Sequence, residues 1–123
     1  AIFFTFWGLN VIKKKHGPSI KKAPTEKMFA HMLPKSSDSL ALSKMNMMGM
    51  GSKMIRGIMK KKNIDSLESL IRQAMDNGVE FIACQMTMDM MGIKKEELLD
   101  GVTVGGVASY MQKAEEAGVN LFI

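Results

Sequence analysis

The sequence contains little cysteine and few aromatic residues, and it has no long hydrophobic run. Cys84 is the single cysteine, which excludes a disulfide within the chain, and no cluster of cysteine and histidine has the spacing of a structural zinc site. No apolar stretch approaches the roughly 20 residues that a membrane-spanning helix needs. We also expect no charged leader with a cleavage site before Ala1. We therefore expect a cytoplasmic protein in a reducing compartment.

Methionine is abundant where aromatic residues are scarce. The chain has 14 methionines and an aromatic content of 7%. Its apolar surface is therefore flexible and polarizable, which suits irregular packing or adaptable contacts. With 46% hydrophobic residues in a length of 123, the chain can bury one core, and we expect residues 1–123 to form a single domain.

The net charge of +5 comes from short lysine clusters at residues 13–15, 21–22 and 60–62. No aromatic residues alternate with these lysines, which argues against a nucleic-acid-binding surface. The pattern predicts a solvated basic rim, with an anionic small ligand or an acidic partner as the second interpretation.

The first half of the chain reads as one strand followed by irregular segments. Residues 1–7 form an apolar, aromatic-rich run that ends at Gly8 and is typical of a buried strand. A helix is expected to start within 9–15. Three prolines and a glycine make 16–34 a predicted loop with a helical turn at 26–31, and 36–63 is predicted to hold two short helices or a loop and a helix.

The second half contains a near-repeat, "AMDNGVEFIAC" and "AEEAGVNLFI". Each copy is typical of an amphipathic helix, a left-handed glycine cap and a short strand. The first helix should begin at Asp65 or Ser66 and end at Gly78. Between the copies we expect a short helix at 94–99, a strand at 102–104 and a helix from Gly105 or Gly106. This order favours a parallel sheet flanked by helices.

Ligands of such sheets bind where the strands end at their carboxyl edge. Cys84 ends the predicted strand of the first repeat copy. Trp7 and Gly8 end the first strand at the equivalent height, provided that the two strands are parallel. The pattern thus locates a site without specifying a reaction.

Four segments together resemble the DsrE/DsrF-like family of sulfur-trafficking proteins. They are "FFTFWGLNVIKK", "KMNMMGMGSKMIRGIMKKKNI", "ACQMTMDMMGIKKEELLDGVTVGGVASYM" and "AGVNLFI". The resemblance implies a three-layer flavodoxin-like α/β fold, usually oligomeric, in which the cysteine after a central strand carries sulfane sulfur as a persulfide. Family members usually have a further strand and helix before "FFTFWG", so we expect an N-terminally incomplete domain that lacks this first unit.

Two interpretations of Cys84 remain from the residues alone. A free cysteine at a strand end is often a buried small hydrophobe. A cysteine that faces the start of a following helix, expected within 86–91, would instead have its thiolate or persulfide stabilised by unpaired N–H groups. Met86 lies in that segment, and Asp89 would oppose the anion unless it caps the helix. The resemblance favours the reactive interpretation.

Other residues carry weaker hypotheses. The methionines of 86–91 are soft ligands that suit Cu(I), although methionine stripes more often serve packing. His31 is a candidate accessory base on a mobile loop. Gly105 and Gly106 lack a full phosphate-binding or dinucleotide motif, so flavin or nucleotide binding rests on fold analogy alone. We therefore predict no cofactor and no bound metal.

A second methionine group could line a helix that docks on a partner or on a membrane surface, next to the lysines at 60–62. Its members are Met45, Met47, Met48, Met50 and Met54.

The main hypothesis is that Cys84 is the nucleophile and carrier of a sulfurtransferase or sulfur carrier. By the resemblance, its partners would be sulfur donors and acceptors such as rhodanese-like or TusA-like proteins. The alternative is a non-catalytic oligomeric module with a structural cysteine and a methionine-rich docking surface. A peroxidase is disfavoured because no second cysteine is present to resolve a sulfenate. Exposed edge strands and the apolar first strand predict a homo-oligomer.

Overall fold

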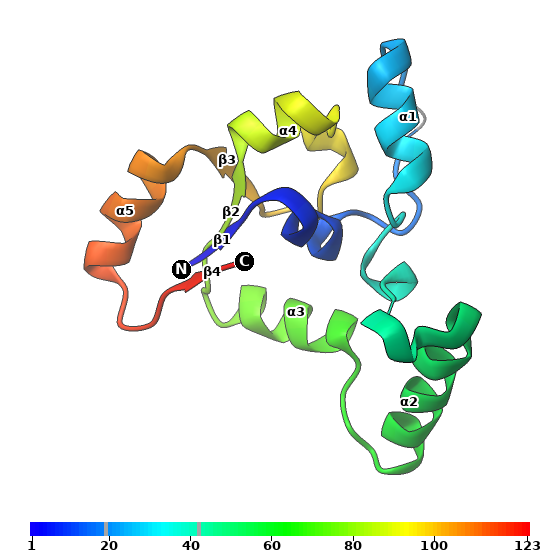
Figure 1. Cartoon of the computed structure of the whole chain (residues 1–123). Helices are drawn as coiled ribbons and strands as arrows, with labels where there is room; N and C mark the ends of the chain where they lie inside the picture. Colours follow the sequence, from blue (N-terminus) through cyan, green and yellow to red (C-terminus); the bar gives the residue numbers. More distant parts are fainter. Residues whose placement is uncertain (19, 42) are drawn as a thin grey trace.

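The computed structural model describes residues 1–18, 20–41 and 43–123, with no side chains for residues 43–45. Its centre is a four-stranded sheet in the order β3-β2-β1-β4. The strands are β1 (Ile2–Phe4), β2 (Phe81–Cys84), β3 (Thr103–Gly105) and β4 (Leu121–Phe122). Every pairing is parallel, and helices flank the sheet (Figure 1). The predicted flavodoxin-like α/β fold is confirmed.

Alternate residues of the central strands face two separate apolar clusters, as the two-residue period of a strand requires. Phe3, Ile82 and Cys84 pack with Tyr110 of α5 (Val107–Glu116) on one face of the sheet. Phe4, Phe81 and Ala83 lie on the other face in the larger core, which includes Ile71 of α3 (Leu67–Asp76). Cys84 therefore shares its face with α5.

The helix-to-strand junction before β2 forms as predicted. The Ser66 hydroxyl accepts a hydrogen bond from the backbone N–H of Ser69 at 3.2 Å, which caps the start of α3. After α3, Gly78 adopts a φ of +84°, the left-handed conformation that glycine tolerates best. Of the apolar positions on α3, Ile71 is buried, whereas Leu67 and Leu70 face solvent.

The second junction differs from the prediction. Helix α5 ends at Glu116, its C-cap residue Ala117 has an extended backbone, and Gly118 has no positive φ. The prediction of a left-handed glycine cap is therefore wrong at this position. The parallel strand that the repeat predicted is nevertheless present as β4, because its pairing with β1 does not depend on how α5 ends.

The first strand is shorter than the apolar run predicts. It ends at Phe4, and Phe6 has a φ of +42°, which turns the chain into the 3-10 helix η1 (Phe6–Ile12). The Asn10 side-chain amide donates to the Trp7 carbonyl oxygen at 2.9 Å and holds this turn. Leu9 and Ile12, three residues apart on one side of η1, are fully buried in the larger core.

The predicted loop at 16–34 contains a full helix, α1 (Pro24–Met32), which includes the expected turn. Helix α1 packs on α4 (Gln85–Met91). Residue 19 of this segment lies outside the described residues.

Within 36–63, of which residue 42 is likewise not described, the helical segments agree with the prediction of short helices. They are η2 (Ser37–Ser39), η3 (Ser43–Gly49) and α2 (Met50–Lys61). The predicted helix at 94–99 is the single 3-10 turn η4 (Lys95–Glu97). Among the described helices, none is long and apolar enough to cross a bilayer.

Phe4 should be a principal contributor to stability. Its side chain is 2% exposed, and its ring centroid lies 5.2 Å from that of Phe81. Because truncation leaves a cavity in a packed core, Phe4→Ala should lower the free energy of unfolding by about 3 to 5 kcal/mol in urea denaturation. The control is Phe6→Ala, which removes a ring that is 54% exposed and should cost less than about 1 kcal/mol. Equal losses of unfolding free energy in the two variants would contradict the structure, in which Phe4 is buried and Phe6 is exposed.

Candidate functional site

Cys84 is the last residue of β2 and the N-cap residue of α4. Its side chain is 4% exposed, and it pairs across the sheet with Gly105 of β3. This is the carboxyl edge of the sheet, where the sequence located the site. Helix α4 begins at Gln85, immediately after the cysteine, so Cys84 lies at the first turn of the helix, although its side chain makes no capping hydrogen bond there.

The pKa of the Cys84 thiol lies below its ordinary value. Burial raises this pKa, but polar groups of the neighbouring segments lower it by more. They are the hydroxyl and backbone N–H of Thr87, the hydroxyl of Thr5 and the backbone N–H of Met86. The site thus favours a thiolate although solvent barely reaches it.

The two threonine hydroxyls also contact each other, with 2.9 Å between the oxygens. Each hydroxyl has a single proton to donate. When one threonine donates to the other, only the second keeps a proton that can favour the Cys84 thiolate, so the two hydroxyls do not act on the sulfur at the same time. Thr87 is fully buried, which restricts the geometry of this pair.

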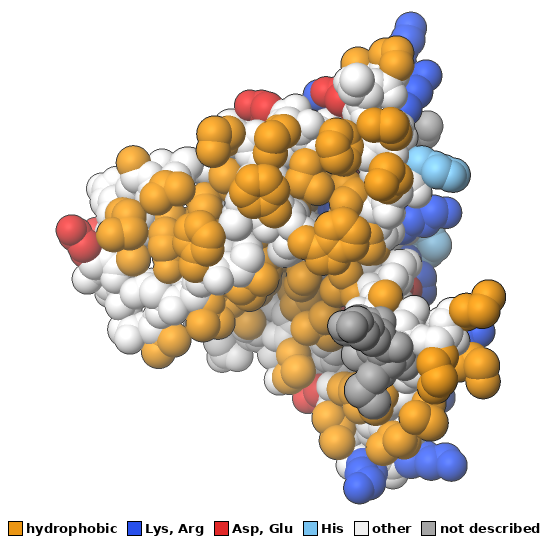
Figure 2. Space-filling model, in the orientation of Figure 1, with side chains coloured by type: hydrophobic (Ala, Val, Ile, Leu, Met, Phe, Trp, Pro, Cys, Tyr) orange, Lys and Arg blue, Asp and Glu red, His pale blue; other side chains and the backbone are white. Residues whose placement is uncertain are grey.

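Exposed apolar side chains lie on η1 and α4, the two elements next to the end of β2, and we call them the Cys84 rim. Helix η1 contacts both β2 and α4. Figure 2 shows hydrophobic side chains gathered over η1 and α4. The rim consists of Phe6, Trp7, Met86 and Met90, which are between 52% and 69% exposed.

The methionines of α4 divide between the core and the surface. Met88 and Met91 are buried in the larger core, whereas Met86 and Met90 belong to the Cys84 rim. Four thioethers on two sides of a helix do not converge on one Cu(I) ion. Within the described residues, no three histidine, cysteine or acidic side chains are grouped to hold a metal ion.

The sequence profile of the DsrE/DsrF/DrsH-like family matches residues 1–122, which includes the whole of this site. The chain belongs to this family. Its sequence is 50% identical over 123 residues to the uncharacterized protein YrkE of Bacillus subtilis (strain 168), covering 100% of this chain and 77% of the relative. It is 36% identical over 126 residues to the sulfur carrier protein DsrE2 of Allochromatium vinosum, covering 99% of this chain and 77% of the relative.

Trp7 and Gly8, the predicted site residues of this DsrE/DsrF/DrsH-like chain, lie in η1 and not at a strand end. Trp7 is 59% exposed on the Cys84 rim. A Cβ atom at Gly8 would lie 2.6 Å from the carbonyl oxygen of Ile123, which accepts a hydrogen bond from the Thr5 N–H at 2.7 Å. Gly8 therefore provides the space in which the backbone after β4 pairs beside Thr5.

Asp89 and His31 are not among the groups that contact the sulfur. Asp89 is exposed on α4 and accepts a hydrogen bond from the Gln85 side chain at 2.8 Å, so it does not cap the helix. His31 is exposed in the last turn of α1, which stands apart from the junction of β2 and α4 (Figure 1). The structure does not bring His31 to Cys84.

Thr5 and Thr87 are the site residues that the sequence interpretation missed. Thr87 lies three residues after Cys84, the spacing at which the N-cap and the third helical residue contact each other, so the motif Cys-x-x-Thr was a usable signal. Thr5 is the one polar residue in the run 1–7. Its position beside Cys84 depends on strand pairing, which no local signal reveals.

Removal of the Thr87 hydroxyl should weaken the thiolate. A hydrogen bond to a charged acceptor contributes about 1.5 kcal/mol or more, so Thr87→Val should reduce the rate of Cys84 alkylation at neutral pH by about tenfold. The pH profile of iodoacetamide alkylation, read by intact mass, should move to higher pH because the pKa of the thiol rises.

Two variants control this experiment. Thr87→Ser restores the hydroxyl and should restore the pH profile. Thr103→Val makes the same change on β3, where the hydroxyl donates to the Phe81 carbonyl oxygen at 3.2 Å, and it should leave the profile in place. An unshifted profile in Thr87→Val would show that the hydroxyl does not act on the sulfur.

Proposed function

We propose that this chain carries sulfane sulfur as a persulfide on Cys84 and passes it to an acceptor protein. The observation that supports this proposal best is the position of Cys84 at the carboxyl end of β2 and the start of α4, where the pKa of its buried thiol lies below the ordinary value. A cysteine that serves packing alone needs no lowered pKa. Membership of a family that includes a protein named as a sulfur carrier agrees with this role.

The loading step exchanges one sulfur–sulfur bond for another. The Cys84 thiolate attacks the outer sulfur of a donor persulfide, a bond forms between Cys84 and that sulfur, and the donor leaves as a thiolate. Delivery is the reverse reaction, in which an acceptor thiolate attacks the outer sulfur and Cys84 leaves. Both steps conserve electrons and need no external oxidant. A lowered pKa makes Cys84 both a ready nucleophile and a good leaving group.

The proposed partners are proteins that bring their own cysteine to the Cys84 rim. Exposed aromatic and methionine side chains around a buried sulfur suit a partner surface that covers the site and excludes water. Rhodanese-like donors and TusA-like acceptors are proposed as the partner classes. A homo-oligomer, a cytoplasmic location and a single domain over residues 1–123 are further proposals.

One observation favours the alternative, a non-catalytic interaction module. Cys84 is only 4% exposed, as is common for a cysteine that serves packing. This alternative predicts that thiol reagents modify Cys84 only in denaturant. The carrier hypothesis predicts slow but measurable modification of the folded protein, with a rate that follows the ionisation of the thiol.

Sulfur loading should be visible in the intact mass of the protein. After incubation of the reduced chain with polysulfide or a persulfidated donor, the mass should rise by whole sulfur atoms and return to its starting value with reductant. Cys84→Ser should gain nothing, because the chain contains no other cysteine.

Far-UV circular dichroism of Cys84→Ser provides the control for folding, since serine is close in size to cysteine. Equal mass gain in the wild type and in Cys84→Ser would refute the proposal. A wild-type chain that no donor loads, and whose thiol titrates only after unfolding, would establish the structural alternative instead.

A further inference from the structure

Helix α2 leaves much of its apolar side in solvent. The charged side of a surface helix normally faces water and its apolar side faces the core. Here Arg56 pairs with Glu68 at 3.3 Å and donates to the Ser37 carbonyl oxygen at 3.4 Å, so a basic residue of α2 faces the rest of the protein. The exposed side of α2 includes Met50, Met54 and Ile58, which are 71%, 58% and 42% exposed.

Further exposed apolar side chains precede the helix. Met47 and Met48 precede α2 and are 64% and 103% exposed, while the side chain of Met45 lies outside the described residues. Figure 2 shows hydrophobic side chains over α2 with Lys and Arg side chains next to them. We call residues 46–62 the α2 segment.

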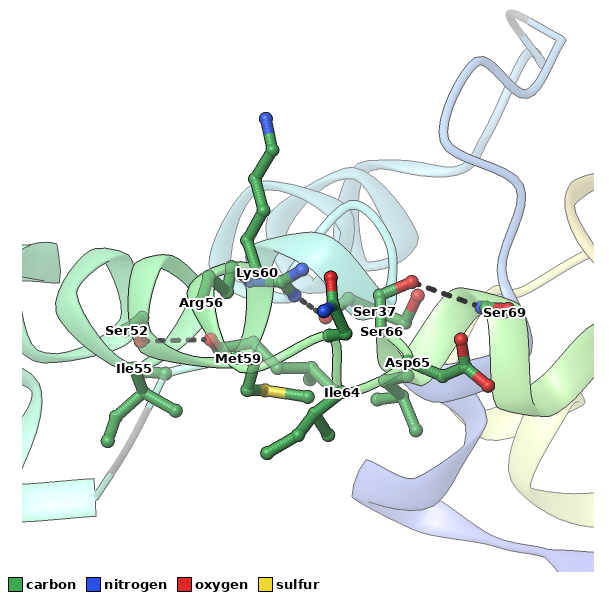
Figure 3. Close-up of a pocket in the computed structure, with 14 residues that line it drawn as sticks. Ser37, Ser52, Ile55, Arg56, Met59, Lys60, Ile64, Asp65, Ser66 and Ser69 are labelled. Carbon is green, nitrogen blue, oxygen red and sulfur yellow. Dashed lines mark hydrogen bonds between the residues drawn. The ribbon is translucent and has the colours of Figure 1, made fainter.

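A pocket of about 820 Å³ adjoins the α2 segment and is mostly apolar in its walls. In Figure 3 the side chains of Ile55, Met59 and Ile64 extend to one side of α2, whereas Lys60 extends to the other. Ile55 is 42% exposed and Ile64 is 52% exposed, so the pocket opens to solvent beside the exposed methionines. The apolar surface is therefore continuous from α2 into the pocket.

The net positive charge of the chain lies in the same region. Residues 39–64 contain six of the 17 basic residues and none of the 12 acidic residues, so the remaining chain holds 11 basic and 12 acidic residues. Lysines of the earlier clusters are engaged elsewhere, as in the ion pairs Lys15–Asp38 at 2.8 Å and Lys22–Glu97 at 2.9 Å. Lys60, Lys61 and Lys62 are exposed at the end of α2.

We propose that the α2 segment binds the surface of an anionic lipid bilayer. Exposed apolar side chains beside lysines, without a single acidic residue, match the chemistry of an interfacial helix on negatively charged headgroups. Met50, Met54 and Ile58 enter the boundary of headgroups and acyl chains, and the lysines contact the headgroups. Residues 39–64 contain no aromatic side chain to stack on bases, which disfavours nucleic acid.

Co-sedimentation with vesicles tests the proposal on the whole chain. Vesicles of phosphatidylcholine and phosphatidylglycerol in equal amounts should bind the protein, and vesicles of phosphatidylcholine alone should not. Added salt should weaken binding, because it screens charges at the surface. Failure to bind the anionic vesicles would overturn the proposal.

The charge variant combines Lys60→Gln, Lys61→Gln and Lys62→Gln and should partition roughly 100-fold less onto anionic vesicles, given the usual contribution of each lysine near such a surface. Its matched control combines Lys21→Gln, Lys27→Gln and Lys35→Gln, which removes the same charge from exposed positions elsewhere. The control should bind within about twofold of the wild type, because these lysines lie outside the α2 segment. Equal losses would show general electrostatic attraction and overturn the assignment to α2.

The apolar variant combines Met50→Gln, Met54→Gln and Ile58→Gln, and binding should fall about tenfold or more. Its control is Met28→Gln with Met32→Gln on α1, which are 56% and 69% exposed, and it should bind as the wild type does. All these side chains are exposed, so circular dichroism should be unchanged. If the apolar variant instead dissociated an oligomer in light scattering and kept its vesicle binding, a second copy would be the occupant and the proposal would fall.

Discussion

The candidate site depends on the parallel register between β1 and β2. Phe4 pairs with Ala83, which sets Thr5 level with Cys84 at the carboxyl edge of the sheet. A shift of one residue would move every side chain of the strand to the opposite face, and Cys84 would then leave Tyr110 and the α5 face. The large aromatic side chains Phe3 and Phe4 fill different clusters and so resist that shift. Core packing thereby determines which groups reach the sulfur.

Local signals in the sequence were enough to predict α3, its two ends and the strand β2 that follows it. The Ser66 cap, Gly78 and the apolar run of β2 act within a few residues, and the structure shows all three. The end of β1 was not readable, because a positive φ at Phe6 is sustained by later packing of η1 and not by a preference of phenylalanine. The position of Cys84 followed from its strand, whereas Thr5 joined the site only through long-range pairing.

The exposure of Met50, Met54 and Ile58 on α2 could not be predicted for a related reason. A surface helix usually buries its apolar side. In this helix the residue that contacts the neighbouring segments is Arg56, through its ion pair with Glu68 and its hydrogen bond to the Ser37 carbonyl oxygen. Such polar contacts arise between segments far apart in the chain, so periodicity alone contains no information about them.

A buried Cys84 can still be reactive, because access to the thiol and ionisation of the thiol have separate causes. Low exposure limits access to the thiol, whereas the polar groups of Thr87, Thr5 and Met86 lower its pKa. A persulfide extends the side chain by a further bond of about 2 Å, which brings the reactive outer sulfur closer to the Cys84 rim than the thiol itself. In Figure 1 helix α2 lies apart from the junction of β2 and α4, so the α2 segment and the Cys84 rim are separate surfaces of the molecule.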